Sequence, residues 1–483
     1  MRALCGSARS PGIRRPTIGV TNPTRWRRST HVWVGVVVLV LVAAVVAIGA
    51  VATSNGSTPR EVQAVTAQPA LVTVAPGVVP VADSAPVPTP GGLTATLAPF
   101  VANPDLGAFT GRVTDAATGK ELWARGAHLP MQPASVNKVL TTAAALLALD
   151  RNARLTTTVV AADQSTSPGL IVLKGGGDPT LSAAAKGVDT WYRDAARISD
   201  LADQVRKSGV APKVVQVDVS AFSGPTMARG WDPLDIDGGD IAPMEAVMLD
   251  GGRTQPVSVD SARSPTPALD AGRALAVALG LNPATVTVRP TPATGEQIAA
   301  VQSPPLIERL REMMNASDNV MAESIGREVA AEMGRPQSFD GAVAAVLGQL
   351  NKAGIDTGGA TLRDSSGLSV DDRLTAETLD EIVTAAAGTS TPRLRPLVDL
   401  LPIAGGSGTL SNRYLDTDAG KAAAGYLRAK TGSLTGTNSL VGFVTDRSGR
   451  VLAFSLMSND AGPTGRTALD AVAATLRSCG CGS

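Results

Sequence analysis

The stretch MQPASVNKVLTTAAALLALD, residues 131–150, decides how the rest of the chain is interpreted. It predicts an apolar helix that is opened by two polar residues, Ser135 and Lys138. Residues three positions apart lie on one face of a helix, so we expect the hydroxyl and the amine to meet at the mouth of a pocket. A serine hydroxyl becomes a good nucleophile only when a base takes its proton. A buried lysine can lose its own proton near neutral pH and act as that base.

Histidine, the most frequent general base, is nearly absent from the chain. Only His31 and His128 occur, and His31 borders a long apolar segment. A Ser-His-Asp triad would have to use His128, which we expect on a loop or at the surface, and a three-histidine zinc centre cannot form within one chain. S-x-x-K alone is a weak signal, because a capping serine followed by a solvated lysine has the same spacing.

Two later triplets complete a set of three. Ser317-Asp318-Asn319 lies in LREMMNASDNVMAESIGREV, and Lys430-Thr431-Gly432 lies in YLRAKTGSLTGTNSLVGFV. S-x-x-K, S-D-N and K-T-G form the signature set of class A β-lactamases and penicillin-binding proteins. Each triplet alone arises by chance, as a capped turn or as a strand end. Their order and local context together indicate a catalytic site.

The N-terminal part predicts a membrane segment. Residues 1–31 form an arginine-rich tail without acidic residues, and residues 32–52 carry no charge. A helix of residues 32–52 would reach roughly 31 Å, enough to cross a bilayer core. The arginines before it predict a cytoplasmic N-terminus and a cell-envelope, extracytoplasmic location for the rest. A signal peptide cleaved after Ala52 is the alternative, and the length of the apolar run favours a single-pass anchor.

The remaining chain predicts a tether and two domains. Residues 53–95 are rich in Pro, Ala, Val, Ser and Thr, so we expect an extended linker. The long interval between the first two triplets indicates an inserted domain over residues 152–258, within a catalytic domain of residues 96–151 and 259–483. Hairpins and helices at both ends of the catalytic domain predict an α+β fold, with helices on both sides of an antiparallel sheet.

Charge and cysteine content exclude several classes of protein. The net charge of +1 predicts no nucleic-acid partner. Cys479 and Cys481 form a C-x-C pair, but no second pair or histidine cluster completes a metal site, so we expect a local disulfide or two free thiols. The sequence implies no metal and no organic cofactor.

Further stretches of the chain carry a family resemblance that covers roughly residues 98–476. LKGGGDPTLS, FSGPTMARGWDP, SPPLIERLREMMNASDN, DSSGLS and LPIAGGSGTL resemble segments of class C low-molecular-mass penicillin-binding proteins, the D-alanyl-D-alanine carboxypeptidase/endopeptidase family. The bias towards Ala, Gly and Arg resembles that of actinobacterial proteins. The resemblance implies a penicillin-recognising serine transpeptidase-like core with an inserted domain. The short insertion implies that the additional third domain of longer family members is missing.

The resemblance implies catalytic roles for three side chains. Ser135 would be the acylated nucleophile, and Lys138 would accept its proton. Ser317 would relay a proton to the leaving amine. The backbone amides of Ser135 and Ser433 would hold the oxyanion, which needs two N–H donors.

It also implies how the substrate binds. Asn319 would hydrogen-bond the substrate backbone, and Lys430 would supply positive potential. Thr431 and Ser433 would bind the terminal carboxylate, which a cation and hydroxyls suit. Gly432 would let the strand pass close to the substrate, where a Cβ would stand in the way.

The chain is thus expected to be a membrane-tethered serine D-Ala-D-Ala carboxypeptidase that trims peptidoglycan stem peptides through an acyl-enzyme and is acylated by β-lactams. Endopeptidase action is left open. A β-lactamase or esterase on the same core is one alternative, although no stretch resembles the class A loop with its deacylating glutamate. A non-catalytic wall-binding scaffold is the other, and the intact catalytic side chains argue against it.

Overall fold

The structure, a computed structural model, describes residues 85–479. The arginine-rich tail, the apolar segment of residues 32–52 and most of the expected linker lie outside these residues. No helix within residues 85–479 is long and apolar enough to cross a bilayer. The linker predicted to run to residue 95 ends earlier, because helix α2 (Pro90–Val101) starts with a proline and is capped by the Thr89 side chain. Proline suits the first helical position, where its missing N–H has no intrahelical partner.

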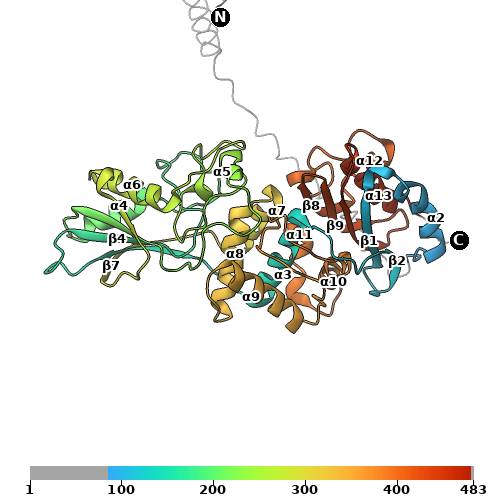
Figure 1. Cartoon of the computed structure of the whole chain (residues 1–483), viewed down its shortest axis with the longest axis horizontal. Helices are drawn as coiled ribbons and strands as arrows, with labels where there is room; N and C mark the ends of the chain where they lie inside the picture. The colour runs from blue at the N-terminus through green and yellow to red at the C-terminus, as the bar shows by residue number, and fades with distance from the viewer. Residues whose placement is uncertain (1–84, 480–483) are drawn as a thin grey trace, which may run out of the picture. The chain divides into compact units, whose positions relative to one another are not determined.

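The catalytic core of the described chain contains a five-stranded antiparallel sheet built from both ends of this region (Figure 1). Its strand order is β2-β1-β10-β9-β8, so that the blue strands and the dark red strands belong to one sheet. The strands are β1 (Ala108–Asp115), β2 (Glu121–Arg125), β8 (Leu427–Leu434), β9 (Thr437–Thr445) and β10 (Val451–Asn459). The predicted hairpins β1–β2 and β9–β10 are confirmed. Strand β8, which carries the third triplet, lies at the edge of this sheet.

Helices cover both faces of the sheet, as the α+β prediction requires. On one face, α2 and α13 (Gly465–Ser478) contribute buried residues to a core shared with β1, β9 and β10. The opposite face buries Val441 and Phe443 of β9 against a set of helices. These helices are α3 (Lys138–Ala148), α7 (Leu306–Ala316), α8 (Asn319–Glu332), α9 (Phe339–Lys352), α10 (Ala376–Ala387) and α11 (Leu397–Leu400).

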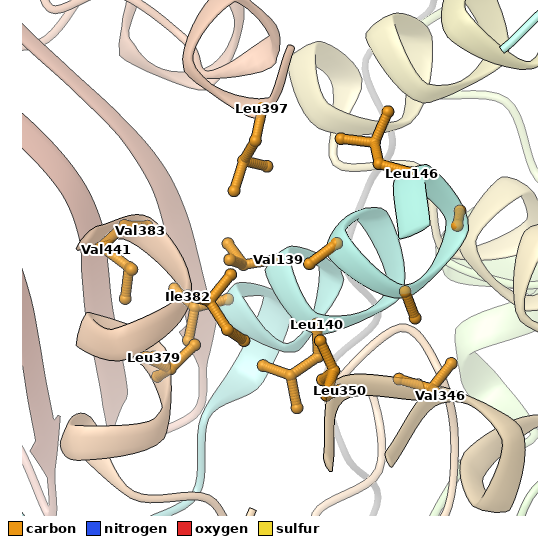
Figure 2. Packing of buried hydrophobic residues seen from close by; sticks show 14 of the residues in the cluster. Val139, Leu140, Leu146, Val346, Leu350, Leu379, Ile382, Val383, Leu397 and Val441 are labelled. Carbon is orange, nitrogen blue, oxygen red and sulfur yellow. The ribbon is translucent and has the colours of Figure 1, made fainter. Parts of the chain in front are cut away.

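Helix α3, whose first residue is Lys138, is held on several sides by apolar contacts. Figure 2 shows its Val139, Leu140 and Leu146 among side chains from α9, α10, α11 and β9. Burial of each such side chain contributes about 1.5–3 kcal/mol, so the helix has a fixed position in the core. The labelled neighbours are Val346, Leu350, Leu379, Ile382, Val383, Leu397 and Val441.

A second sheet forms the inserted domain, with the order β6-β5-β4-β3-β7. Helices α4 (Ile198–Lys207) and α6 (Pro267–Leu279) share its apolar core. The strands are β3 (Thr156–Ala161), β4 (Leu170–Lys174), β5 (Val214–Asp218), β6 (Thr287–Arg289) and β7 (Glu296–Gln302). The boundary expected at residue 258 therefore falls too early. Strand β7 returns to pair with β3, and this long-range pairing leaves no local mark in the sequence.

The structure shows the surroundings of His128 and Cys479, the residues considered for a catalytic triad and for a C-x-C metal site. His128 is exposed, as expected. Cys479 is buried and disulfide-bonded, and its partner lies outside the described residues. Of the two alternatives for the C-x-C pair, two free thiols are therefore contradicted.

Candidate active site

Ser135 and Lys138 meet as their spacing predicts. Ser135 lies in a 3-10 turn, Ala134–Asn137, which leads into α3 at Lys138. Lys138 is fully buried, and its Nζ lies 2.9 Å from Ser135 Oγ. The regular helix begins later than the pattern of residues 131–150 suggested, because Ala134 has a φ of 50°. This conformation is uncommon for a residue with a side chain and marks a strained turn next to Ser135.

Lys138 Nζ has two oxygen partners besides Ser135. It donates to Asn319 Oδ1 at 2.6 Å and to the backbone oxygen of Ser366 at 2.7 Å. Burial lowers the pKa of Lys138 from 10.5 to about 8, while Asp364 and other acids oppose this shift. Once the ammonium has lost a proton, its two remaining N–H groups can serve these two oxygens. The lone pair can then face Ser135 Oγ, which is the arrangement a general base needs.

The DSSG segment, residues 364–367, supplies a partner of Lys138 that sequence reasoning missed. The Asp364 carboxylate accepts the backbone N–H groups of Ser366 at 3.0 Å, Gly367 at 2.6 Å and Ser369 at 2.7 Å. These bonds close a turn that aims the Ser366 carbonyl at Lys138. An aspartate followed by serine and glycine is typical of such a turn, but nothing in the sequence connects it to Lys138.

This DSSG turn also packs directly on the turn that carries Ser135. A Cβ on Gly367 would stand 1.9 Å from the backbone oxygen of Ala134. Asn137 donates from its side chain to the backbone oxygen of Asp364 at 3.1 Å, and the indole of Trp231 donates to the Asp364 carboxylate at 2.7 Å. Lys138, Ser135 and the DSSG turn therefore form one connected unit.

The second triplet lies where the sequence places it, in the turn between α7 and α8. Ser317 ends α7 with a φ of 57°, and Asp318 caps α8 by accepting the Met321 N–H at 3.0 Å. Ser317 Oγ lies 2.9 Å from Lys430 Nζ. Asn319 accepts from Lys138 and donates to the backbone oxygen of Asp240 at 3.0 Å.

The third triplet lies on β8 beside Ser135. Lys430 is fully buried and donates to Ser317 Oγ and to the backbone oxygen of Thr431 at 2.7 Å. Burial, together with the charges of Lys138 and Arg413, holds the pKa of Lys430 well below its ordinary value. A bound carboxylate would favour the charged form of this lysine and raise its pKa.

Gly432 lets two segments of the protein lie close together, a contact that the sequence did not indicate. A Cβ at this position would stand 2.1 Å from Ser439 Oγ, 2.7 Å from the backbone oxygen of Pro133 and 3.0 Å from the backbone nitrogen of Ser135. The glycine thus lets β8 lie against the backbone of Pro133 and Ser135. This contact holds the strand that carries Ser433 next to Ser135, as an oxyanion hole made from their amides requires.

A cleft of about 900 Å³ opens over this cluster. Ser135, Ser317, Asn319, Thr431 and Ser433 all line it, whereas Lys138, Lys430 and Gly432 lie behind its wall. All eight residues singled out from the sequence are therefore brought to one site.

Two further residues of the cleft wall had no predicted role. Thr409 shares a hydrogen bond of 2.8 Å with Thr431, so a second hydroxyl stands at the expected carboxylate site. Arg413 also lines the cleft and is paired with Asp470. Both residues fall in or next to the stretch LPIAGGSGTL, which carried the family resemblance without a chemical signature of its own.

Two protein families together, and each of two carboxypeptidases, match this chain over most of its length. Residues 93–263 and 258–476 match the D-Ala-D-Ala carboxypeptidase 3 (S13) family, and residues 21–80 match the Carboxypeptidase Rv3627c-like, N-terminal domain. The chain is 72% identical over 462 residues to Carboxypeptidase DacB of Mycolicibacterium smegmatis, covering 95% of this chain and 100% of that protein. It is 63% identical over 459 residues to Carboxypeptidase Rv3627c of Mycobacterium tuberculosis, covering 95% and 99%.

A solved structure shows the same fold. Penicillin binding protein 4 (dacB) from Haemophilus influenzae superposes with a TM-score of 0.64 at 23% sequence identity. The match covers 80% of this chain and 98% of that chain. The likeness therefore extends over the inserted domain as well as the core.

Proposed function

Because the chain belongs to the D-Ala-D-Ala carboxypeptidase 3 (S13) family and is a serine-type D-Ala-D-Ala carboxypeptidase, we propose that it trims peptidoglycan stem peptides on the outer side of the cell membrane. One observation carries the chemistry. Lys138 Nζ is buried, has a pKa near 8 and lies 2.9 Å from Ser135 Oγ. A neutral amine at this distance can take the proton of the attacking hydroxyl.

In the proposed acylation step, Ser135 Oγ attacks the carbonyl carbon of the penultimate D-alanine while its proton passes to Lys138 Nζ. The oxyanion lies at the amides of Ser135 and Ser433. Ser317 delivers a proton to the departing nitrogen of the terminal D-alanine, and Lys430, 2.9 Å away, is placed to replace that proton. The C–N bond breaks and the acyl-enzyme remains. Lys138 releases the proton that it gained and Lys430 regains one by exchange with solvent. Water then attacks the ester carbonyl, one of its protons returns to Ser135 Oγ as the ester C–O bond breaks, and the shortened peptide leaves with a new carboxyl group.

The third triplet supports recognition of a free C-terminus. Thr431 and Thr409 present two hydroxyls that share one hydrogen bond, beside the buried amine of Lys430. A carboxylate would receive hydroxyl donors and a positive charge at the same place, and charge-assisted hydrogen bonds are the stronger kind. A β-lactam offers a carboxylate at a comparable distance from its reactive carbonyl, so we propose covalent inhibition of Ser135 by β-lactams.

The activity can be tested on two defined substrates. We expect a pentapeptide ending in D-Ala-D-Ala to release free D-alanine with the wild-type protein and none with Ser135→Ala. A folded wild-type protein that releases no D-alanine would count against the proposal. A cross-linked peptide dimer tests endopeptidase action in parallel, because bridge cleavage gives two monomers and no free D-alanine.

The two alternative functions give different results with penicillin. A β-lactamase on this core would turn penicillin over rapidly, whereas the proposed enzyme would accumulate a stable adduct. A non-catalytic scaffold would retain its cellular effect in the Ser135→Ala variant. Loss of that effect together with D-alanine release supports the carboxypeptidase.

We further propose that residues 32–52 anchor the protein in the membrane. The support is the uncharged run itself and the arginines that precede it. Membrane fractionation of the full chain and of a chain lacking residues 1–52 tests the anchor. N-terminal sequencing of the mature protein decides between an anchor and cleavage after Ala52, since cleavage would yield a new N-terminus at Thr53.

A further inference from the structure

We propose that the inserted domain holds the catalytic turn Ser317–Asn319 in its working position, through Tyr192 and Arg253 acting on Asp318. This inference deepens the proposed function and rests on it, because it takes the roles of Ser317 and Asn319 as given. It assigns a task to a domain that lies between the first two triplets and contains neither of them. Tyr192 and Arg253 are positioning residues in this account.

Asp318 is shared between the core and the insert. Its side chain is fully buried, with an exposed fraction of 0%. One oxygen caps α8 by accepting the Met321 N–H at 3.0 Å. The other accepts the Tyr192 hydroxyl at 2.7 Å and lies 3.6 Å from Arg253 Nη1. The residue between Ser317 and Asn319 is therefore fixed from two sides, and a buried hydrogen bond to a charged group is among the stronger ones.

The insert is shaped to present these two side chains. The Arg253 guanidinium stacks on the Trp191 ring, 3.8 Å from its centre. Gly251 has a φ of 65°, and a Cβ there would stand 2.5 Å from the Tyr192 hydroxyl and 2.8 Å from Arg263 Nη1. The chain thus wraps closely around the Tyr192 hydroxyl, and glycine meets both the steric and the backbone requirement.

A second contact from the insert sets the orientation of Asn319. A side-chain amide can be turned in two ways, and the backbone oxygen of Asp240 accepts its Nδ2 at 3.0 Å. This bond leaves Oδ1 towards Lys138 Nζ, 2.6 Å away. With the amide reversed, Lys138 would face a donor and lose one of its two oxygen partners besides Ser135 Oγ.

The charges around Asp318 give a way to tell positioning from electrostatics. Burial opposes ionisation of the Asp318 carboxyl. The charges of Arg263 and Arg253 and the hydrogen bonds to the carboxyl together outweigh burial, so the pKa of Asp318 lies below its usual value. Its negative charge in turn raises the pKa of Lys138. The acylation rate should fall at low pH as Lys138 gains a proton, and Asp318→Asn should therefore move this fall, the acid limb of the profile, to lower pH. Tyr192→Phe removes no charge and should not change the pH of the acid limb.

The test measures the second-order rate constant for acylation of Ser135 by a fluorescent penicillin. For each variant, the pH dependence of this constant and the melting temperature are measured as well. We expect Tyr192→Phe to lower this constant about tenfold, since misplacement of a catalytic group by 1 Å can cost 10²-fold. Arg253→Lys should lower it similarly. In the double variant Tyr192→Phe/Asp318→Asn, the loss should be smaller than the product of the two single losses, because both changes break one contact.

Two matched variants control for global effects. Tyr426→Phe makes the same change at an exposed tyrosine. Arg450→Lys weakens the buried ion pair between Arg450 and Asp115, and Arg450 directly precedes the first residue of β10. Both should acylate at the wild-type rate, even where the melting temperature falls.

Three results would overturn the inference. The first is that folded Tyr192→Phe acylates at the wild-type rate. The second is that the rate losses of the two single variants multiply in the double variant. The third is that Arg450→Lys loses as much rate as Tyr192→Phe at the same fall in melting temperature. If Tyr192→Phe does not fold, Arg253→Lys decides by the same criteria. Failure of the wild-type protein to acylate at all would instead overturn the proposed function.

Discussion

The pH dependence of acylation follows directly from the burial of Lys138. The neutral amine is the active form, so the rate should fall as the pH drops through the pKa of about 8. The perturbation of interest is Asp240→Asn. Asp240 lines the cleft, and its charge is one of those that raise the pKa of Lys138. Removing this charge should move the acid limb of the profile to lower pH.

The size of the effect can be worked out from the titration of one group. With a pKa of about 8, half of the Lys138 amines are neutral at pH 8, about one in ten at pH 7 and about one in a hundred at pH 6. A lysine with a pKa of about 8 instead of 10.5 is neutral roughly 300 times more often at pH 7. Burial of this one side chain thus supplies most of the active form near neutral pH.

The charged groups that surround Lys138 modify this limb. Asp364, Asp318, Glu323 and Asp240 all raise its pKa. Burial raises the pKa of Glu323 to about 7, so Glu323 becomes neutral over the same range as the pH falls. Its loss of charge lowers the pKa of Lys138, and the limb should therefore be shallower than tenfold per pH unit.

The assay measures the rate at which a fluorescent penicillin acylates Ser135 between about pH 5.5 and pH 9.5, at intervals of roughly half a pH unit. Asp260→Asn is the matched control, because Asp260 is an exposed aspartate of the insert that does not line the cleft. A flat profile from pH 6 to pH 9, or an acid limb centred near 10, would refute the assignment of Lys138 as the base. An Asp240→Asn limb that moves to higher pH would refute the electrostatic part.

Three further variants test other parts of the site. Gly432→Ala should lower acylation about a hundredfold while the protein stays folded, because the new Cβ displaces β8 from Ser135; a wild-type rate would contradict the packing argument. Lys430→Gln should impair a peptide with a free C-terminal carboxylate far more than its C-terminal amide, measured as kcat/KM, and equal losses would contradict carboxylate recognition. Asp364→Asn should move the acid limb to lower pH and reduce the melting temperature, and an unchanged limb would show that this carboxylate does not act on Lys138.

The sequence predicted the chemistry better than the architecture around it. Three short polar patterns, on a helix start, a turn and a strand, were enough to place Ser135, Lys138 and Ser317 at one site. Their local signals coincide with their function, because helix spacing aligns Ser135 with Lys138 and a capping turn exposes Ser317.

What the sequence missed depends on pairing over long distances. Ser366 contacts Lys138 and Thr409 contacts Thr431. Both lie in turns whose sequences are ordinary, so only the folded chain shows these partners. The insert boundary was set too early because β7 pairs with β3 across most of the insert. The contact of Gly432 with the backbone at Ser135 was also missed, since a sequence does not reveal which part of the protein lies against a glycine.

The most direct test of the central claim is the intact mass of the protein after exposure to penicillin near neutral pH. We expect one covalent adduct, mapped to the peptide that contains Ser135. It should be absent from Ser135→Ala and form at least about a hundredfold more slowly in Lys138→Gln. An adduct on another residue, or an undiminished rate in Lys138→Gln, would contradict the claim that the buried amine of Lys138 activates Ser135.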